Sequence, residues 1–352
     1  MPNKLPFLDL ARGLAAIFMV CTHVVSINTE RQIAEHSIFG IVITLLGEAP
    51  AAPVFMVIMG ILYTYKKQHQ FTHDIKRSFS LFAKGYYLNL LRLTVPFTLF
   101  LFYMPFDTSE SDDKLTNFVD DIISNLLVVD ILQVAGLSYL IMAIINKLQL
   151  KDVFITFLII LVLVCSPFIW GLGTDVQFWG RLLEPLWGIN GEMVSFPLFP
   201  WIIYPLIGMI LGRRYSNPLT LTTQAMGYQF GFGALLSSIG LLISKTNMSF
   251  HFGDYWRTGP GGLILYIGFI MQWLALMFFL SPYLHKGFLN IISFISTHIT
   301  NFYIVQWVII SASVVVLEQH KLDITESLIA IIITIAMSFL ICKKLQKHNV
   351  NL

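Results

Sequence analysis

Long apolar stretches recur along the whole chain and are separated by short polar segments. A run of about 18 or more mainly apolar residues is long enough to cross a bilayer as a helix. The pattern predicts about ten helical spans, near residues 6–27, 39–64, 80–104, 124–146, 152–171, 198–213, 224–244, 261–281, 289–317 and 324–342. We therefore expect an all-α, polytopic membrane protein, with one helical bundle forming a single domain over residues 1–352.

Two longer polar segments interrupt this pattern. Residues 105–123 carry an acidic run from Asp107 to Asp113, and residues 172–197 are rich in Trp, Gly and Glu. The first apolar stretch differs from a secretory signal, which has its charges before the apolar run and a small-residue cleavage site after it. Asp9 and Arg12 lie inside this run and no convincing cleavage site follows, so we expect a retained first span.

The composition excludes several classes of protein. Hydrophobic residues make up 56% of the chain and charged residues 12%, about half the charged fraction of soluble domains. The net charge of +2 is too small to indicate a nucleic-acid partner. The three cysteines (Cys21, Cys165 and Cys342) lie in apolar runs, so we expect no disulfide framework. Motifs of soluble phosphate-binding, protease and hydrolase sites are missing, and no paired ligand cluster predicts a metal or a permanently bound cofactor.

Basic residues indicate the orientation, because Lys and Arg flanking membrane spans favour the cytoplasmic side. With the N-terminus inside, fifteen basic residues fall on the inner side and six on the outer side. The inner set is Lys4, Arg12, Lys66, Lys67, Lys76, Arg77, Lys84, Lys147, Lys151, Arg213, Arg214, Lys286, Lys343, Lys344 and Lys347; the outer set is Arg31, Lys114, Arg181, Lys245, Arg257 and Lys321. We therefore expect both termini in the cytoplasm.

Ionisable residues within spans are the main candidates for function, because each costs about 3 kcal/mol to place in the bilayer. They are Asp9, Arg12, His23, Glu48, Arg92, Asp130 and His298. Arg12 and His23 are eleven residues apart, which is about three helical turns or roughly 16 Å on one helix face. Asp9, three residues before Arg12, can pair with it. The alternative is an interfacial arginine and a histidine that merely bonds to a neighbouring helix.

Glu48 lies beside a break in the second span, where Pro50 and Pro53 remove backbone donors. It can pair with His23 or line a polar cavity, or it can be a structural partner of an arginine. In the fourth span, Asp130 and Gln133 are expected on one helix face, where helix packing is the alternative to a role in binding. Arg92 can neutralise Asp130 or Glu48, or hold a phosphate. His298 can form packing hydrogen bonds, and His36 lies in the first outer loop.

The segment from Leu8 to His23 resembles the first core span of the transmembrane acyltransferase superfamily. In acyltransferase family three the hallmark is Arg, ten residues, then His, which Arg12 and His23 match. The branch it resembles most contains heparan-alpha-glucosaminide N-acetyltransferase and its bacterial relatives. Stretches 52–60, 130–139 and 196–201 resemble further segments of that branch in the same order, and 302–307 matches loosely. That branch often has Asn at the position of His23, Arg at that of Val134, and a proposed acetyl-carrying His in the first outer loop, where His36 is the nearest match.

The resemblance implies acetyl-CoA as the acyl donor on the cytoplasmic side and a glycan or glycolipid as the acceptor on the other side of the membrane. The membrane is expected to be the inner membrane of a bacterium. Arg12, Asp9 and Arg92, with the basic segment 66–84, are then expected to hold CoA. His23 or His36 would deprotonate the acceptor or carry the acetyl group, with Glu48 as a further catalytic candidate. Asp130, Gln133 and His298 are expected to contact the acceptor, and residues 105–123 and 172–197 to shape its site.

Two other classes of protein stay open. A transporter or flippase for a glycan or lipid-linked intermediate also has broken helices and intramembrane charges, although the two halves of this chain show no inverted repeat. A channel or receptor needs none of the matched stretches.

Overall fold

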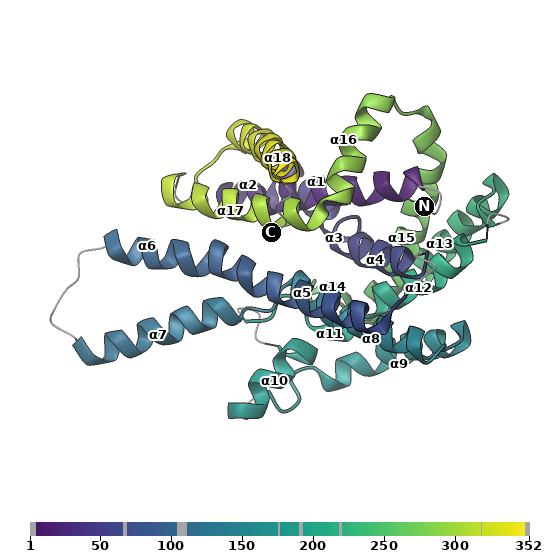
Figure 1. Cartoon of the computed structure of the whole chain (residues 1–352), viewed down its shortest axis with the longest axis horizontal. Helices are drawn as coiled ribbons and strands as arrows, with labels where there is room; N and C mark the ends of the chain where they lie inside the picture. Colours follow the sequence, from purple (N-terminus) through teal and green to yellow (C-terminus); the bar gives the residue numbers. More distant parts are fainter. Residues whose placement is uncertain are drawn as a thin grey trace.

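The computed structural model describes residues 5–65, 69–103, 111–174, 177–189, 193–217, 220–317 and 319–348, and this part of the chain is all-α (Figure 1). Its first half contains α1 (Pro6–Asn28), α2 (Arg31–His36), α3 (Ile38–Glu48), α4 (Ala52–Tyr65), α5 (Phe71–Asn89), the π-helix η1 (Leu90–Thr94), α6 (Val95–Tyr103), α7 (Ser111–Leu127), α8 (Ile131–Lys147) and α9 (Asp152–Ile169). The second half contains α10 (Gln177–Trp187), α11 (Leu198–Trp201), α12 (Ile203–Tyr215), α13 (Thr223–Ser244), α14 (Met248–Phe252), α15 (Pro260–Leu280), the 3-10 helix η3 (Ser281–Tyr283), α16 (Lys286–Thr297), α17 (Ile299–Leu317) and α18 (Ile324–Lys347).

Six helices in the described ranges are long and apolar enough to cross a membrane: Pro6–Asn28, Ile38–Tyr65, Asp152–Ile169, Thr223–Ser244, Pro260–Tyr283 and Ile324–Lys347. The pair α16 and α17 adds a seventh if its 85° bend is counted as one broken span. The chain is therefore an all-α, multi-pass membrane protein with six or seven candidate spans. The other expected spans are shorter or divided. The expected span 80–104 is divided among α5, η1 and α6, and the expected span 198–213 is divided between α11 and α12. Within the expected span 124–146, the apolar helix is the shorter α8.

Two expected helical positions are corrected by the structure. Asp130 does not share a helix face with Gln133; it is the N-cap of α8 and forms a capping box with that glutamine. His298 lies at the bend between α16 and α17, not inside a continuous span. Part of the expected 105–123 loop is helical, since α7 begins at Ser111. Lys4, Lys66, Lys67 and the start of the acidic run at Asp107 lie outside the described residues.

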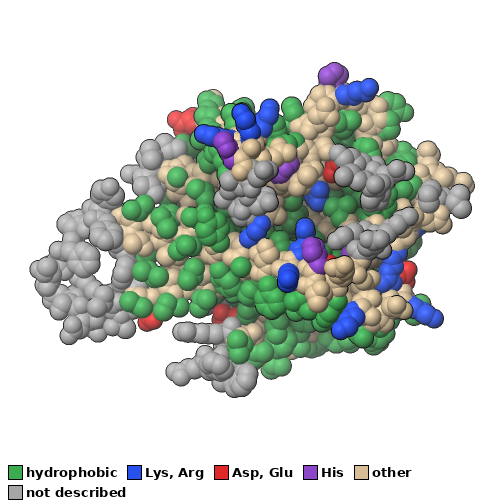
Figure 2. Space-filling model, viewed as in Figure 1, with side chains coloured by type: hydrophobic (Ala, Val, Ile, Leu, Met, Phe, Trp, Pro, Cys, Tyr) green, Lys and Arg blue, Asp and Glu red, His purple; other side chains and the backbone are tan. Residues whose placement is uncertain are grey.

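Helix α1 is central to the packing, because α3, α4, α15, α16, α17 and α18 all contact it. Helices α4 and α12 cross at Gly60 and Gly208, where a Cβ atom on either glycine would overlap the backbone of the other helix. Helices α9, α13 and α18 are instead exposed along apolar faces, as at Phe168, Tyr228 and Ile332. Hydrophobic side chains accordingly cover broad areas of the described surface (Figure 2), as expected for a protein solvated by lipid.

Candidate active site

The side chain of His23 packs against α17 in the interior of the bundle. Its ring centroid lies 4.1 Å from that of Trp307, with the planes tilted by 32°, and 6.1 Å from that of Tyr303. The Nδ1 atom is buried and has no hydrogen-bond partner among the described residues. A buried polar atom without a partner costs about 1–3 kcal/mol. The Nδ1 atom is therefore available to a ligand or a proton.

A buried ion pair lies next to this histidine. Arg92 Nη1 is 2.6 Å from Asp130 Oδ2, and the two side chains are only 7% and 6% exposed. Tyr303 Oη donates to the same carboxylate oxygen at 3.1 Å, while the backbone N–H of Ile131 donates to Oδ1 at 2.7 Å. The Arg92 guanidinium also lies 4.6 Å from the centre of the Trp307 ring. The carboxylate is therefore fully engaged, and its charge is balanced beside His23.

The backbone that carries Arg92 has an unusual conformation. Arg92 and Thr94 lie in the π-helix η1, a feature that often occurs at functional sites. Asn89, just before it, accepts from Arg92 Nη2 at 3.2 Å and donates through Nδ2 to the carbonyl oxygen of Val128 at 2.6 Å. Arg92 Nε and Thr94 Oγ1 are buried without partners in the described part of the chain. The π-helix thus presents further polar atoms to the interior.

A second polar cluster lies three turns along α1, at its N-terminal end. Arg12 Nε donates to Ser296 Oγ at 2.8 Å, and Arg12 Nη2 lies 3.7 Å from Asp9 Oδ1. Ser296 and Ser293 both donate to the Asp9 carboxylate, at 2.8 and 3.0 Å. Arg77 is close enough to act electrostatically on Arg12. This end of the bundle therefore concentrates positive charge around an arginine whose orientation is fixed by α16.

A small void of about 10 Å³ lies against α1 at Met19, a position between those of the two clusters in the sequence. Met19 of α1 lines it, together with Phe55, Ile131, Leu132, Ile299, Thr300 and Tyr303. Arg12, Met19 and His23 follow one another at spacings of seven and four residues, so they share one face of the helix. Apart from the hydroxyls of Thr300 and Tyr303, the lining is apolar. The void thus touches the helix face that carries Arg12 and His23, and it has room for about one water molecule.

The other expected site residues form contacts that do not include His23. Glu48 accepts from Tyr266 Oη at 3.1 Å, and its carbonyl oxygen accepts from Tyr255 Oη at 3.0 Å. Burial raises the pKa of Tyr255 well above its usual value, so this hydroxyl stays protonated as a donor. His36 is exposed at the end of α2. His298 Nδ1 bonds to the carbonyl oxygen of Phe294 at 3.0 Å.

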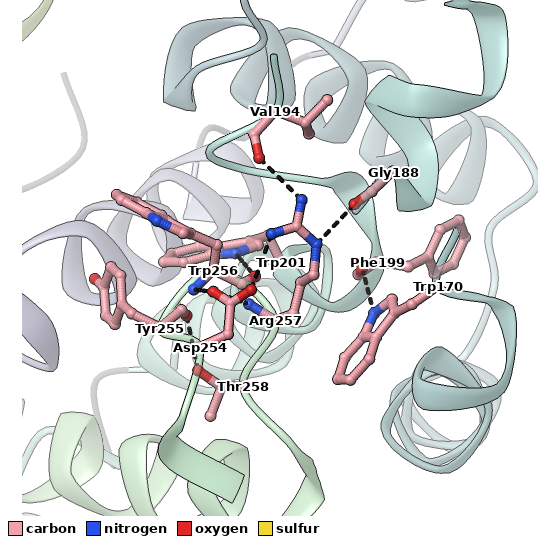
Figure 3. A network of polar contacts seen from close by, with 10 residues as sticks. All are labelled: Trp170, Gly188, Val194, Phe199, Trp201, Asp254, Tyr255, Trp256, Arg257 and Thr258. Atoms are coloured by element: carbon pink, nitrogen blue, oxygen red, sulfur yellow. Dashed lines mark hydrogen bonds and ion pairs between the residues drawn. The ribbon is translucent and has the colours of Figure 1, made fainter. Parts of the chain in front are cut away.

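An aromatic and charged network joins segments beyond the membrane helices (Figure 3). Buried Arg257 contacts Asp254 at 3.0 Å and donates to the carbonyl oxygens of Gly188 at 2.7 Å and Val194 at 3.1 Å. Trp201 Nε1 donates to the carbonyl oxygen of Trp256 at 2.8 Å. These contacts attach the described part of the 172–197 segment to residues 253–258. The sequence predicted Arg257 only as a basic residue on the outer side, and in the structure it links Asp254 to the carbonyl oxygens of Gly188 and Val194.

Several partners could not be identified from the sequence. Tyr303 and Trp307 belong to a stretch that matches the family only loosely, and neither carries a charge that marks it. Nothing in the sequence marks Ser293 and Ser296 as partners of Asp9; the fold brings them within hydrogen-bond distance of its carboxylate. Within the described residues, no group of three or more His, Cys, Asp and Glu side chains is placed to hold a metal ion.

Comparison with known proteins gives one match. The family model described as "Heparan-alpha-glucosaminide N-acetyltransferase, catalytic" matches residues 4–244, which is more than half of the chain. No curated protein matches the sequence. The matched range contains Arg12, His23, Arg92 and Asp130, whereas Tyr303 and Trp307 lie beyond it.

Proposed function

The chain belongs to the heparan-alpha-glucosaminide N-acetyltransferase catalytic family, and on that premise we propose that it transfers an acetyl group across a membrane. The donor is acetyl-CoA on the cytoplasmic side, and the acceptor is a sugar hydroxyl or amine of a glycan or glycolipid on the other side. One observation carries the proposal. Half-buried His23, whose buried Nδ1 atom has no partner among the described residues, lies on the same face of α1 as Arg12, which belongs to the cationic cluster at the opposite end of that helix.

The membrane arrangement is part of the proposal. Helices α5 to α6, α8, and α11 to α12 would complete ten crossings together with the seven candidate spans, in a single domain. Both termini would lie in the cytoplasm, in the inner membrane of a bacterium. The excess of Lys and Arg on one side of the predicted spans supports this orientation.

The cationic end of α1 suits the phosphates of CoA. A guanidinium has five N–H donors in a fixed fork, and Arg12 uses its Nε donor on Ser296. The Nη groups, of which one faces Asp9 at 3.7 Å, remain for phosphate oxygens. Arg77 and Lys84, which act on each other electrostatically, supply two more cations on α5. Asp9 would orient Arg12. Arg92 is paired with Asp130, and we therefore assign the phosphates to Arg12, Arg77 and Lys84.

We place the extended arm that links the CoA phosphates to the thioester at the small void, which holds about one water molecule and has to open for the arm to enter. Its lining is mostly apolar, and it ends beside Tyr303, whose ring lies near His23. Donor binding has to separate α1 slightly from α8 and α17, since these helices form the walls. The thioester would then lie beside the histidine.

At His23 the chemistry is proton transfer coupled to acyl transfer. An imidazole nitrogen takes the proton of the acceptor O–H or N–H while the new bond to the acetyl carbon forms. The carbon–sulfur bond breaks, and the proton passes from His23 to the leaving sulfur, so that free CoA thiol is produced. Trp307 holds the imidazole plane, and the Arg92–Asp130 pair fixes Tyr303 beside it.

The test uses the full-length protein in lipid nanodiscs with acetyl-CoA labelled in the acetyl group. Release of free thiol and labelled acceptor are followed with amino sugars, neutral sugars and glycolipids as acceptors. We expect release of CoA that depends on both protein and acceptor. If no acceptor is labelled, and the protein instead moves the sugar across the membrane of sealed vesicles, the transporter function replaces this proposal.

A further inference from the structure

A cavity of about 330 Å³ lies where the ends of three membrane helices meet. Helix α1 ends at Asn28, the span that contains α3 begins at Ile38, and α18 begins at Ile324, just after the turn that lines the cavity. Because spans end at the surface of the bilayer, the cavity lies at the level of the lipid headgroups. Small-molecule sites start at about 300 Å³, so there is room for one ligand of headgroup size.

Two opposite charges on α2 line the cavity. Arg31 and Glu35 are four residues apart, so they lie on one face of the helix, and both are exposed. In the described part of the chain, no ion pair joins them to each other or to another side chain. A guanidinium suits phosphate oxygens, and a carboxylate suits an ammonium group. This wall therefore complements a zwitterion that carries a phosphate and a primary amine.

The other walls of the cavity are tied together by hydrogen bonds. Thr22 Oγ1 of α1 donates to the carbonyl oxygen of Ile43 in α3 at 3.3 Å. The turn before α18 is attached to the end of α1, since the backbone N–H of His320 donates to the carbonyl oxygen of Ile27 at 3.1 Å. The ring Nδ1 atom of His320 also lies 3.2 Å from the carbonyl oxygen of Thr29. The cavity is therefore part of the packed fold.

An exposed apolar face of α3 leads from the cavity into the membrane. Ile38, Ile41, Val42 and Leu45 follow one another at helical spacing and are all exposed, so they form one apolar stripe. Thr44, which lines the cavity, is exposed three residues after Ile41 and lies beside this stripe. A ligand in the cavity can therefore continue along α3 as a hydrocarbon chain, which favours a lipid over a soluble zwitterion.

We propose that this cavity binds the headgroup of one phosphatidylethanolamine molecule. Arg31 binds the phosphate, Glu35 binds the ammonium group, and the acyl chains follow the exposed face of α3. A choline headgroup has no N–H to donate to Glu35, and a glycerol headgroup has no positive charge, so lipids with these headgroups bind more weakly. The proposal does not rest on the acetyltransferase function.

Native mass spectrometry of the full-length protein in detergent tests the site, with dioleoyl lipids that differ only in the headgroup. The wild type should bind one phosphatidylethanolamine about 10-fold more tightly than phosphatidylcholine or phosphatidylglycerol, and Glu35→Gln should remove most of the preference over phosphatidylcholine, as expected for one charged hydrogen bond. Glu30→Gln is the matched control, because Glu30 is an exposed carboxylate on the same segment but outside the cavity lining.

A second pair of variants tests the phosphate contact. Arg31→Gln should weaken binding of all three lipids by about 10-fold, since each carries a phosphate. Lys245→Gln, which changes an exposed cation at the end of α13, should leave binding unchanged. Equal affinity of the wild type for the three lipids, or equal effects of Glu35→Gln and Glu30→Gln, would overturn the proposal. Displacement of the lipid by an equal concentration of free O-phosphoethanolamine would also overturn it, because the cavity would then be a site for a soluble zwitterion.

Discussion

The Arg92–Asp130 pair permits a quantitative test of the site's electrostatics. Asp130→Asn keeps the oxygen that accepts from Ile131 at the N-cap of α8, places an amide NH₂ where Oδ2 accepts from Tyr303, and removes the charge. The Arg92 cation is then buried alone. Breaking a buried pair in this way costs about 3–5 kcal/mol. Arg92→Met leaves the Asp130 carboxylate buried without its cation and should lower the free energy of unfolding by a similar amount. The double variant removes both charges and should lie within about 2 kcal/mol of the wild type, the main loss being the contact of Arg92 with Trp307.

The free energy of unfolding, measured by titration with a denaturing detergent in mixed micelles, gives the coupling between the two residues. Arg213 and Asp152 provide the control, since their nitrogen and oxygen atoms are also 2.6 Å apart but the side chains are 29% and 52% exposed. That pair should show a coupling of only about 0.2–1 kcal/mol. If the costs of Asp130→Asn and Arg92→Met simply add in the double variant, the two charges are not coupled and this description of the site is refuted.

The remaining predictions concern the donor end and the helix packing. Arg12→Ala should weaken acetyl-CoA binding by about 1.5–3 kcal/mol, the value of a charged hydrogen bond. Arg213→Ala is the control and should leave the affinity unchanged. If both variants bind acetyl-CoA equally well in a direct binding assay, Arg12 is not part of the donor site. Gly208→Val should prevent the close approach of α4 and α12 and greatly lower the yield of monodisperse protein in size-exclusion chromatography, because its new side chain meets the backbone of α4 at Val57 and Gly60. Gly231→Val, on a face where a Cβ meets nothing within 4 Å, is the control and should purify normally.

The spacing of polar residues along single helices was informative in the sequence. The eleven-residue interval from Arg12 to His23 places both on one face of α1, and Asp9 faces Arg12 as its spacing suggests. The break beside Glu48 follows from two prolines, which cannot donate to a helix. These features are local, so the amino-acid pattern determines them.

Helix ends inside apolar stretches were harder to predict. Asp130 has apolar residues on both sides within the segment 124–146, which concealed the start of α8 at Ile131. A signal was present, since Asp130 followed three residues later by Gln133 has the pattern of a capping box. The bend at His298 has neither proline nor glycine to mark it.

Partners far apart in the sequence could not be assigned from it. Glu48 bonds to Tyr266, which is 218 positions away, and Asp130 accepts from Tyr303, which is 173 positions away. Asp130 and Glu48 were both possible partners for Arg92, and the fold, in which η1 packs against α17, pairs Arg92 with Asp130. Such choices depend on how helices cross, which hydrophobic periodicity does not specify.

Turnover of labelled acetyl-CoA by His23→Ala tests the central claim most directly. The account predicts a fall in the rate of acetyl transfer of about 10²–10⁴-fold, the contribution of a general base, with acetyl-CoA binding retained because the lost interaction belongs to the transition state. His36→Ala, which changes an exposed histidine on α2, should transfer acetyl groups at nearly the wild-type rate. Near-normal turnover by His23→Ala together with an inactive His36→Ala would contradict the account and place the chemistry at the outer histidine.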